Sequence, residues 1–252
     1  MILLLAVIVS STSGFTQAQT DELGVTFDLT YMNKWMSRGA QVWKADGGFF
    51  ETIDVDLWGT GFGVAVMHRS STNSGWVNKH RFDYRVYYGD FLFDDEPYKT
   101  KYKVAWIYKH YYDSPRNARN VQAWTLNLSW PEILGSTGLV PYYVSYYDYP
   151  SGSHYGLVDH WAGWVHCFGL GYDLQVPELP NPLHLTSEIA YTDGLRAAEH
   201  DWSYATFGVS TSFELSENMA FVPGIYHQIS MEDSVNSRND ITYCKISMKY
   251  KF

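Results

Sequence analysis

A histidine and a serine stand two residues apart in the run His68-Arg69-Ser70. Alternate side chains of an extended strand project from the same face, so this imidazole and this hydroxyl are neighbours. Such a pair can attack an ester when the histidine takes the serine proton and a third polar group orients the histidine. The expected third group is missing, because Asn78 falls in a predicted loop and Phe82 and Tyr84 occupy the same face of the following strand. We therefore interpret the pair as polar residues at a boundary of the strand and predict no enzymatic activity.

Two other groups of residues are of types that could carry out chemistry or bind a metal ion. Asp54 and Asp56 share one face of a strand and could act as an acid–base pair or bind Ca²⁺, but pairing with interior arginines is favoured. Cys167 and Cys244 fall on opposite faces by strand parity, so they are expected to remain two free thiols, and no zinc-type Cys/His spacing occurs. The sequence therefore predicts no metal and no cofactor.

The elements that carry these residues have a period of two, which is typical of strands. In the segment 241–252, one face holds Cys244, Ile246, Met248, Tyr250 and Phe252, and the other holds Lys245, Ser247, Lys249 and Lys251. The segment 98–111 repeats this arrangement of an apolar, aromatic face opposite a lysine-rich face. A sandwich would bury the apolar face, whereas a membrane barrel turns it outward to lipid.

Twelve such segments are predicted, and several have the ~10 residues that a tilted strand needs to cross a bilayer. They are 23–36, 49–58, 61–70, 80–93, 98–111, 120–130, 139–149, 161–175, 183–192, 202–215, 219–231 and 241–252. The connections alternate between mostly tight turns, such as 59–61 and 216–218, and longer polar loops, such as 37–48 and 150–160. This alternation is what an even-stranded barrel with both ends of its chain on one side requires, so we predict an all-β, antiparallel up-and-down transmembrane barrel of about twelve strands.

Composition supports a membrane barrel. Aromatic residues make up 17% of the 252 residues and charged residues only 18%, and the mean hydropathy is −0.26. After position 20 no run approaches the ~20 apolar residues of a helical span. Residues 1–18 form an apolar run with small residues at its end, which predicts a signal peptide followed by a barrel over 19–252. The net charge of −9 argues against nucleic acid as a partner.

Two terminal regions resemble known outer-membrane proteins. The ending Tyr250-Lys251-Phe252 resembles the signal that the bacterial barrel-assembly machinery reads. The stretches 31–39 and 54–62, with Arg38-Gly39 and Gly61-Phe62, look like the first hairpin of the TorF-like putative porins. This resemblance implies a porin-like role in the outer membrane of a Gram-negative-type bacterium and supplies no catalytic residues. The His68-x-Ser70 spacing resembles instead the outer-membrane phospholipase family, which makes a lipid hydrolase the alternative.

If the apolar rows face lipid, the charged rows face the enclosed space, and basic residues outnumber acidic ones there. The predicted pore-lining residues are Arg38, Asp54, Asp56, Arg69, Arg81, Asp83, Arg85, Lys99, Lys101, Lys103, Glu188, Lys245, Lys249 and Lys251. Cationic rings favour anions, so we predict a narrow channel for small solutes with a modest anion preference. Two alternatives remain: a structural or binding barrel whose bases pair with acids and fill the lumen, and a secreted β-sandwich that binds carbohydrate. The oligomeric state is left open.

Overall fold

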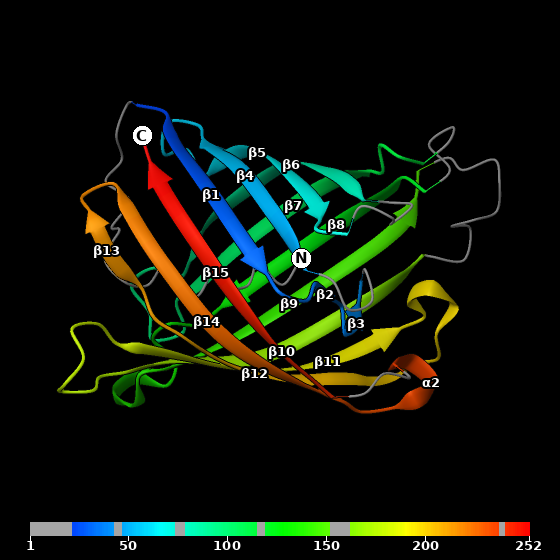
Figure 1. Ribbon diagram of the computed structural model, residues 1–252. Helices are drawn as coiled ribbons and strands as arrows, with labels where there is room; N and C mark the ends of the chain where they lie inside the picture. Colours follow the sequence, from blue (N-terminus) through cyan, green and yellow to red (C-terminus); the bar gives the residue numbers. More distant parts are fainter. Residues whose placement is uncertain (1–21, 43–46, 74–78, 115–118, 152–161, 237–239) are drawn as a thin grey trace.

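The computed structural model describes residues 22–42, 47–73, 79–114, 119–151, 162–236 and 240–252. The predicted signal peptide therefore lies outside the described residues. Within them the chain forms a closed antiparallel barrel, whose tilted strands enclose one interior (Figure 1). Each barrel strand pairs with the next one along the chain, and the first pairs with the last, with Thr26 opposite Lys251 and Met32 opposite Lys245.

Twelve strands form the wall of the barrel, as predicted. They are β1 (Gly24–Met32), β4 (Gly48–Asp56), β5 (Phe62–Ser71), β6 (His80–Leu92), β7 (Thr100–His110), β8 (Val121–Ser129), β9 (Leu139–Pro150), β10 (Gly163–Leu174), β11 (Leu183–Asp193), β12 (Asp201–Ser210), β14 (Met219–Ser230) and β15 (Ile241–Lys251). The short β13 (Phe213–Ser216) pairs with β14 and prolongs its hairpin beyond the wall. Closure of the sheet confirms the predicted fold class, and the β-sandwich alternative is wrong.

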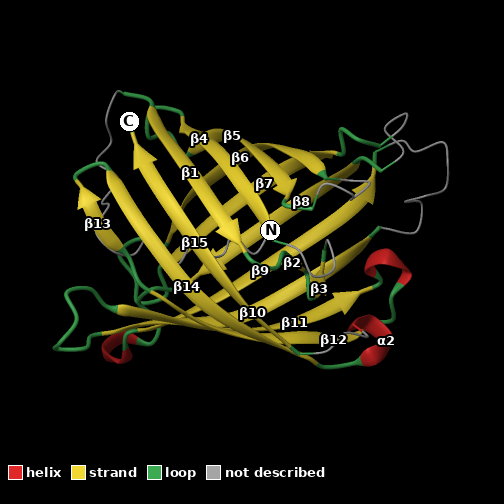
Figure 2. Ribbon diagram, in the orientation of Figure 1, coloured by secondary structure: helices red, strands yellow, loops and turns green. Residues whose placement is uncertain are grey.

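The two ends of the barrel differ in their connections. At the turn end, where β1 begins and the C-terminus lies, connections that are shorter on average join β4 to β5, β6 to β7, β8 to β9, β10 to β11 and β12 to β14. At the loop end lie the connections that follow β1, β5, β7, β9, β11 and β14, including α2 (Asp233–Asn236). Figure 2 shows the helical turns confined to these two ends. No helix within the described ranges is long and apolar enough to cross a membrane.

Side chains alternate between an apolar outer wall and a polar interior. On β15, Ile246 and Tyr250 are 43% and 39% exposed on the outside, whereas Lys245 is 6% exposed inside. On β6, Tyr84 and Val86 are exposed between the buried Arg81, Asp83 and Arg85. An apolar surface that continues around the whole wall would be unstable in water, and lipid is the medium that suits it.

Tyrosine rings line the interior by lying over glycines of neighbouring strands. Gly169 on β10 is the cross-strand partner of Tyr142 on β9, and Gly63 on β5 is the partner of Tyr87 on β6. A Cβ atom added at either glycine would lie 2.1 Å from the partner's ring. Only glycine therefore lets these rings lie flat against the inner wall, and each ring covers the strand where its partner has no side chain.

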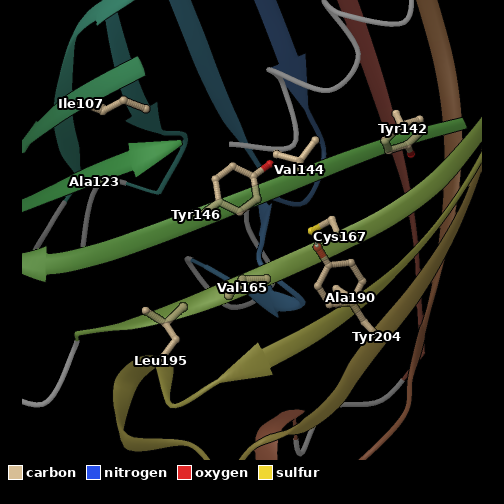
Figure 3. Close-up of a cluster of buried hydrophobic side chains, with 10 residues drawn as sticks. All are labelled: Ile107, Ala123, Tyr142, Val144, Tyr146, Val165, Cys167, Ala190, Leu195 and Tyr204. Atoms are coloured by element: carbon tan, nitrogen blue, oxygen red, sulfur yellow. Dashed lines mark hydrogen bonds between the residues drawn. The ribbon is translucent and has the colours of Figure 1, made fainter. Parts of the chain in front are cut away.

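A buried cluster extends this packing across the wall from β7 to β12. Figure 3 shows its ten side chains, among them Tyr146, Cys167, Ala190 and Tyr204. Cys167 is buried in this cluster, whereas Cys244 is exposed on the outer face of β15, and both are free. The prediction of two unpaired thiols on opposite faces is confirmed.

The connection after β1 departs from the prediction. The expected strand 23–36 ends at Met32, and the chain then makes a small hairpin of β2 (Met36–Ser37) and β3 (Ala40–Gln41) at the loop end. Arg38 and Gly39 join the two strands with φ of 53° and 78°, as a two-residue hairpin with both turn residues at positive φ requires. The hairpin folds inward because Trp35 and Met36 are apolar: they are 3% and 0% exposed.

Candidate functional site

The inward hairpin brings Arg38 to the opposite wall. Its guanidinium holds the Asp148 carboxylate on β9 with both terminal nitrogens, and Nη2 donates to Oδ1 at 2.6 Å. Lys109 on β7 donates to the same carboxylate, at 2.8 Å to Oδ1 and 3.0 Å to Oδ2. The Gln228 amide donates to the Gly39 carbonyl at 2.7 Å. One carboxylate thus holds a cation from the hairpin and a cation from the wall.

A second ionic cluster lies beside the first on β5 and β6. Arg81 donates through Nη2 to Asp83 Oδ2 at 2.9 Å, and Arg69 donates to the same oxygen. The Trp35 ring of the inward-folded connection lies 5.2 Å from the Arg69 guanidinium and 5.1 Å from that of Arg81. Arg69 is fully buried. Flat guanidinium groups suit such stacking, so the aromatic ring and Asp83 hold both arginines in fixed positions.

A small pocket opens between the hairpin and these clusters. Its lining residues are Ser37, Arg38, Arg81, Lys109, Tyr111, Val121, Asp148 and Arg196. Arg196 comes from the connection between β11 and β12, where it adopts a φ of 60°. The pocket therefore contains four cationic side chains and one carboxylate, Asp148. These charges make the electrostatic potential inside the pocket positive.

Toward the turn end the interior changes from arginines to lysines. Lys103 on β7 places its ammonium 3.4 Å from the centre of the Tyr87 ring, and Lys245 is buried midway along β15. Tyr87 donates its hydroxyl hydrogen to Asp54 Oδ1 at 2.5 Å. Lys249 stands opposite Asp28 in the register of β15 and β1. β7 and β15 are far apart around the barrel, so their lysines form two separate columns on the inner wall.

The rim of the turn end carries three further predicted residues. Lys99 pairs with Asp94 at 3.0 Å, and this hydrogen bond raises the pKa of Lys99 above its ordinary value. Asp56 accepts a hydrogen bond from the Gly59 backbone at 2.6 Å, which fixes the turn between β4 and β5. Lys251 is exposed at the end of β15.

The predicted residues thus fall into separate groups. Arg38, Arg69, Arg81 and Asp83 meet at the loop end, whereas the predicted lysines lie toward the turn end, except Lys245, which lies midway along β15. Arg85 and Glu188 lie between, and Glu188 accepts a hydrogen bond from Tyr204 at 3.0 Å. That these residues line a conducting path stays a prediction. Sequence reasoning missed Asp148, although its row Tyr142, Val144, Tyr146 and Asp148 has the parity of the inner face.

The outer wall holds the residues first singled out for catalysis. His68 on β5 bonds through Nδ1 to Glu51 on β4 at 2.9 Å, and through Nε2 to Nδ1 of His80 on β6 at 3.0 Å. Glu51 therefore orients His68, the role for which we found no candidate among the residues after Ser70. A neutral His68 that donates through Nδ1 accepts the His80 hydrogen at Nε2, so that nitrogen is directed at His80 and not at Ser70. Ser70 stands directly opposite His80 in the register of β5 and β6.

Comparison with solved structures supports the fold. A NanC porin matches with a TM-score of 0.54 and 11% sequence identity, covering 90% of this chain and 100% of the porin chain. The COG4313 outer membrane channel from Pseudomonas putida F1 matches with a TM-score of 0.51 and 8% identity, covering 95% and 99%. Outer membrane phospholipase A from Escherichia coli matches with a TM-score of 0.48 and 11% identity, covering 89% of each chain.

The likenesses to the NanC porin and to the COG4313 channel show that the fold is that of bacterial outer-membrane β-barrels. No protein-family model and no curated protein matches the sequence. Membership of the TorF-like porins therefore stays a prediction.

Proposed function

We propose that the protein is a porin-like channel of the Gram-negative outer membrane that passes small solutes and prefers anions. The observation that carries this proposal is the contrast between the two faces of the wall. Apolar side chains such as Ile246 and Tyr250 cover the outside, and cationic side chains such as Lys245 and Arg85 occupy the inside. A closed barrel with this polarity gives charged solutes a polar interior across an apolar medium.

The proposed anion preference rests on which cations are paired. At the loop end Asp83 and Asp148 each bind two cations, so the cations there remain in excess. In the interior, Lys103 lies near Asp54, and Lys245 and Lys249 lie near Asp28, so these three lysines face two aspartates among the described residues. A positive wall attracts anions and repels cations within about one Debye length, ~8–10 Å at ordinary ionic strength.

Planar-bilayer recording with the purified, refolded protein tests this function directly. The expected result is conductance in potassium chloride, with a reversal potential under a salt gradient that shows chloride to be more permeant than potassium. Absence of conductance would contradict the channel proposal, and preference for potassium would contradict its anion selectivity. A difference in electrophoretic mobility between boiled and unboiled samples verifies that the protein is a folded barrel.

The proposed partners follow from the same arrangement. The apolar outer wall would contact outer-membrane lipid, and small solutes would enter the interior. Tyr250 and Phe252 are exposed at the turn end, 39% and 72%, where the barrel-assembly machinery could bind them during insertion. Replacing Phe252 with serine should lower the amount of barrel in outer-membrane fractions while leaving refolding in detergent unchanged.

A second candidate is a lipid hydrolase with Ser70 as nucleophile. The hydrogen bond between Glu51 and His68 favours it, since a carboxylate that orients a histidine is a usual part of such a site. The bond from His68 Nε2 to His80 weighs against it. For a hydrolase, Ser70→Ala should abolish ester hydrolysis, whereas Ser71→Ala, which changes the inward-facing neighbour, should not. A wild type without esterase activity, or full activity in Ser70→Ala, would remove this candidate.

A further inference from the structure

We propose that the pocket at the loop end is a binding site for small solutes that carry a carboxylate, and that Asp148 occupies it as an internal ligand until a solute replaces it. The inference rests on the channel proposed above and names the chemistry that its entrance recognises. The proposed binding site consists of the Arg38 guanidinium, the Lys109 ammonium and the Arg196 side chain, which all line the pocket.

The geometry shows that the pocket recognises a carboxylate. Arg38 binds both oxygens of Asp148 with its two terminal nitrogens, and Lys109 reaches both oxygens as well. Parallel contacts of a guanidinium to a carboxylate are directional and charge-assisted. Arg38 lies 110 positions from Asp148 in the chain, so tertiary structure alone brings the pair together. A solute carboxylate would meet the same donors in the same arrangement.

The charge balance of the region favours an additional anion. Among the described residues that line the pocket, Arg38, Arg81, Lys109 and Arg196 stand beside one carboxylate, Asp148, and Asp83 binds Arg81 next to them. Buried cations are costly unless anions or hydrogen-bond acceptors compensate them. An incoming carboxylate would add negative charge to this cationic lining.

The internal ligand is held in a way that permits exchange. Arg38 belongs to a two-residue turn and adopts a φ of 53°, a conformation that is strained for a residue other than glycine. The hairpin holding it, 36–41, has two-residue strands and is a separate sheet from the barrel wall. A solute that takes the Arg38 fork from Asp148 therefore removes an anchor of the hairpin without disturbing the ladder of the wall.

The first experiment asks whether the pocket accepts a free carboxylate. Asp148→Ala removes the internal ligand and leaves a space for acetate, which has the shape of the missing side chain. We expect the variant to unfold at a lower temperature than the wild type, and acetate to restore a large part of the loss. Acetamide, which has the same shape without the charge, should restore none. Asp54→Ala is the matched control, because Asp54 accepts from the Tyr87 hydroxyl at the other end of the interior.

The second experiment asks whether a solute competes with Asp148 in the wild type. Hydrogen exchange of residues 36–41 is measured in acetate and in acetamide at constant ionic strength. The expected result is exchange about threefold to tenfold faster in acetate, because the hairpin opens more often when Arg38 is engaged elsewhere. This measurement needs no variant, so it decides the matter even if Asp148→Ala does not fold.

The outcomes separate this inference from the channel itself. Rescue of Asp148→Ala without any effect of acetate on the wild-type hairpin would overturn the inference, because the pocket would then hold Asp148 alone. Absence of rescue in a folded Asp148→Ala would overturn it as well. A carboxylate response in detergent together with zero conductance in bilayers would remove the channel and leave the binding site. Anion conductance without a carboxylate response would support the channel and remove the binding site.

Discussion

The loop end and the turn end of the interior neutralise charge in different ways. At the loop end, Arg69 and Arg81 share one buried carboxylate and stack against Trp35. At the turn end, Lys103 lies over a tyrosine ring, and Lys251 is exposed at the rim. Arginine forks suit fixed, buried pairs, whereas a lysine ammonium is compact, strongly hydrated and mobile. The loop end therefore holds its cations in fixed ionic clusters, whereas the lysines toward the turn end have fewer fixed partners among the described residues.

The largest expected effect is on stability at the loop end. Asp83→Ala leaves Arg69 and Arg81 without their shared carboxylate, and removing one partner of a buried ion pair costs about 3–5 kcal/mol. Asp54→Ala at the turn end removes a hydrogen bond from Tyr87 and should cost only about 1.5 kcal/mol. Urea unfolding of the refolded barrel in detergent measures both. Equal losses of unfolding free energy in the two variants would show that the carboxylates at the two ends contribute equally to stability.

The second effect concerns the inward hairpin. Gly39 has a φ of 78°, and a Cβ atom there would lie 2.5 Å from Tyr204, so Gly39→Ala is opposed by both backbone and packing. We expect a loss of about 2 kcal/mol and faster hydrogen exchange over residues 36–41. Gly135→Ala is the matched control: that glycine has a φ of 44° but open space around it, and should lose only about 1 kcal/mol. Unchanged exchange in Gly39→Ala would mean that the hairpin is not held by this contact.

Much of the barrel could be predicted from alternation alone. In β15 and β7 the lysine row and the apolar row are so distinct that their faces follow from the sequence, and the twelve strands lie close to their expected positions. Alternation works because the side-chain period of a strand is two, and because each face of a barrel wall meets one kind of medium. The alternating lengths of the connections likewise reflect the chain crossing from one end to the other.

The missed features depend on contacts between distant segments. The inward hairpin was expected to be a strand end and an outer loop, because nothing local shows that Arg38 reaches Asp148 on the far wall. The pair Arg38-Gly39 was the available signal, since two residues of this kind suit a tight hairpin. Glu51 was overlooked beside His68, although a carboxylate in the apolar outer row between Phe49 and Ile53 needs a polar partner.

A third effect tests the lysine columns of the turn end. Lys99→Glu combined with Lys249→Glu places negative charge on both columns, and should weaken or reverse the preference for anions. Reversal potentials in planar bilayers measure the change. The arginines of the loop end remain in this variant. A reversed preference would therefore show that the turn end determines selectivity, whereas an unchanged ratio of chloride to potassium permeability would assign selectivity to the loop end. Lys79→Glu with Lys34→Glu, which alters the charge outside the columns, serves as the control.

The smallest effect is at the exposed rim of the turn end. The hydrogen bond to Asp94 raises the pKa of Lys99 above its ordinary value of 10.5, so protonated Lys99 favours the folded state. A group whose pKa is raised on folding contributes its full stabilisation below its unfolded pKa, and the contribution disappears as the pH rises through the folded pKa. The difference in unfolding temperature between the wild type and Lys99→Met should therefore shrink toward zero between about pH 9 and pH 12. A difference for Lys99 that stays constant over this range would mean that Asp94 does not stabilise the ammonium in the folded state.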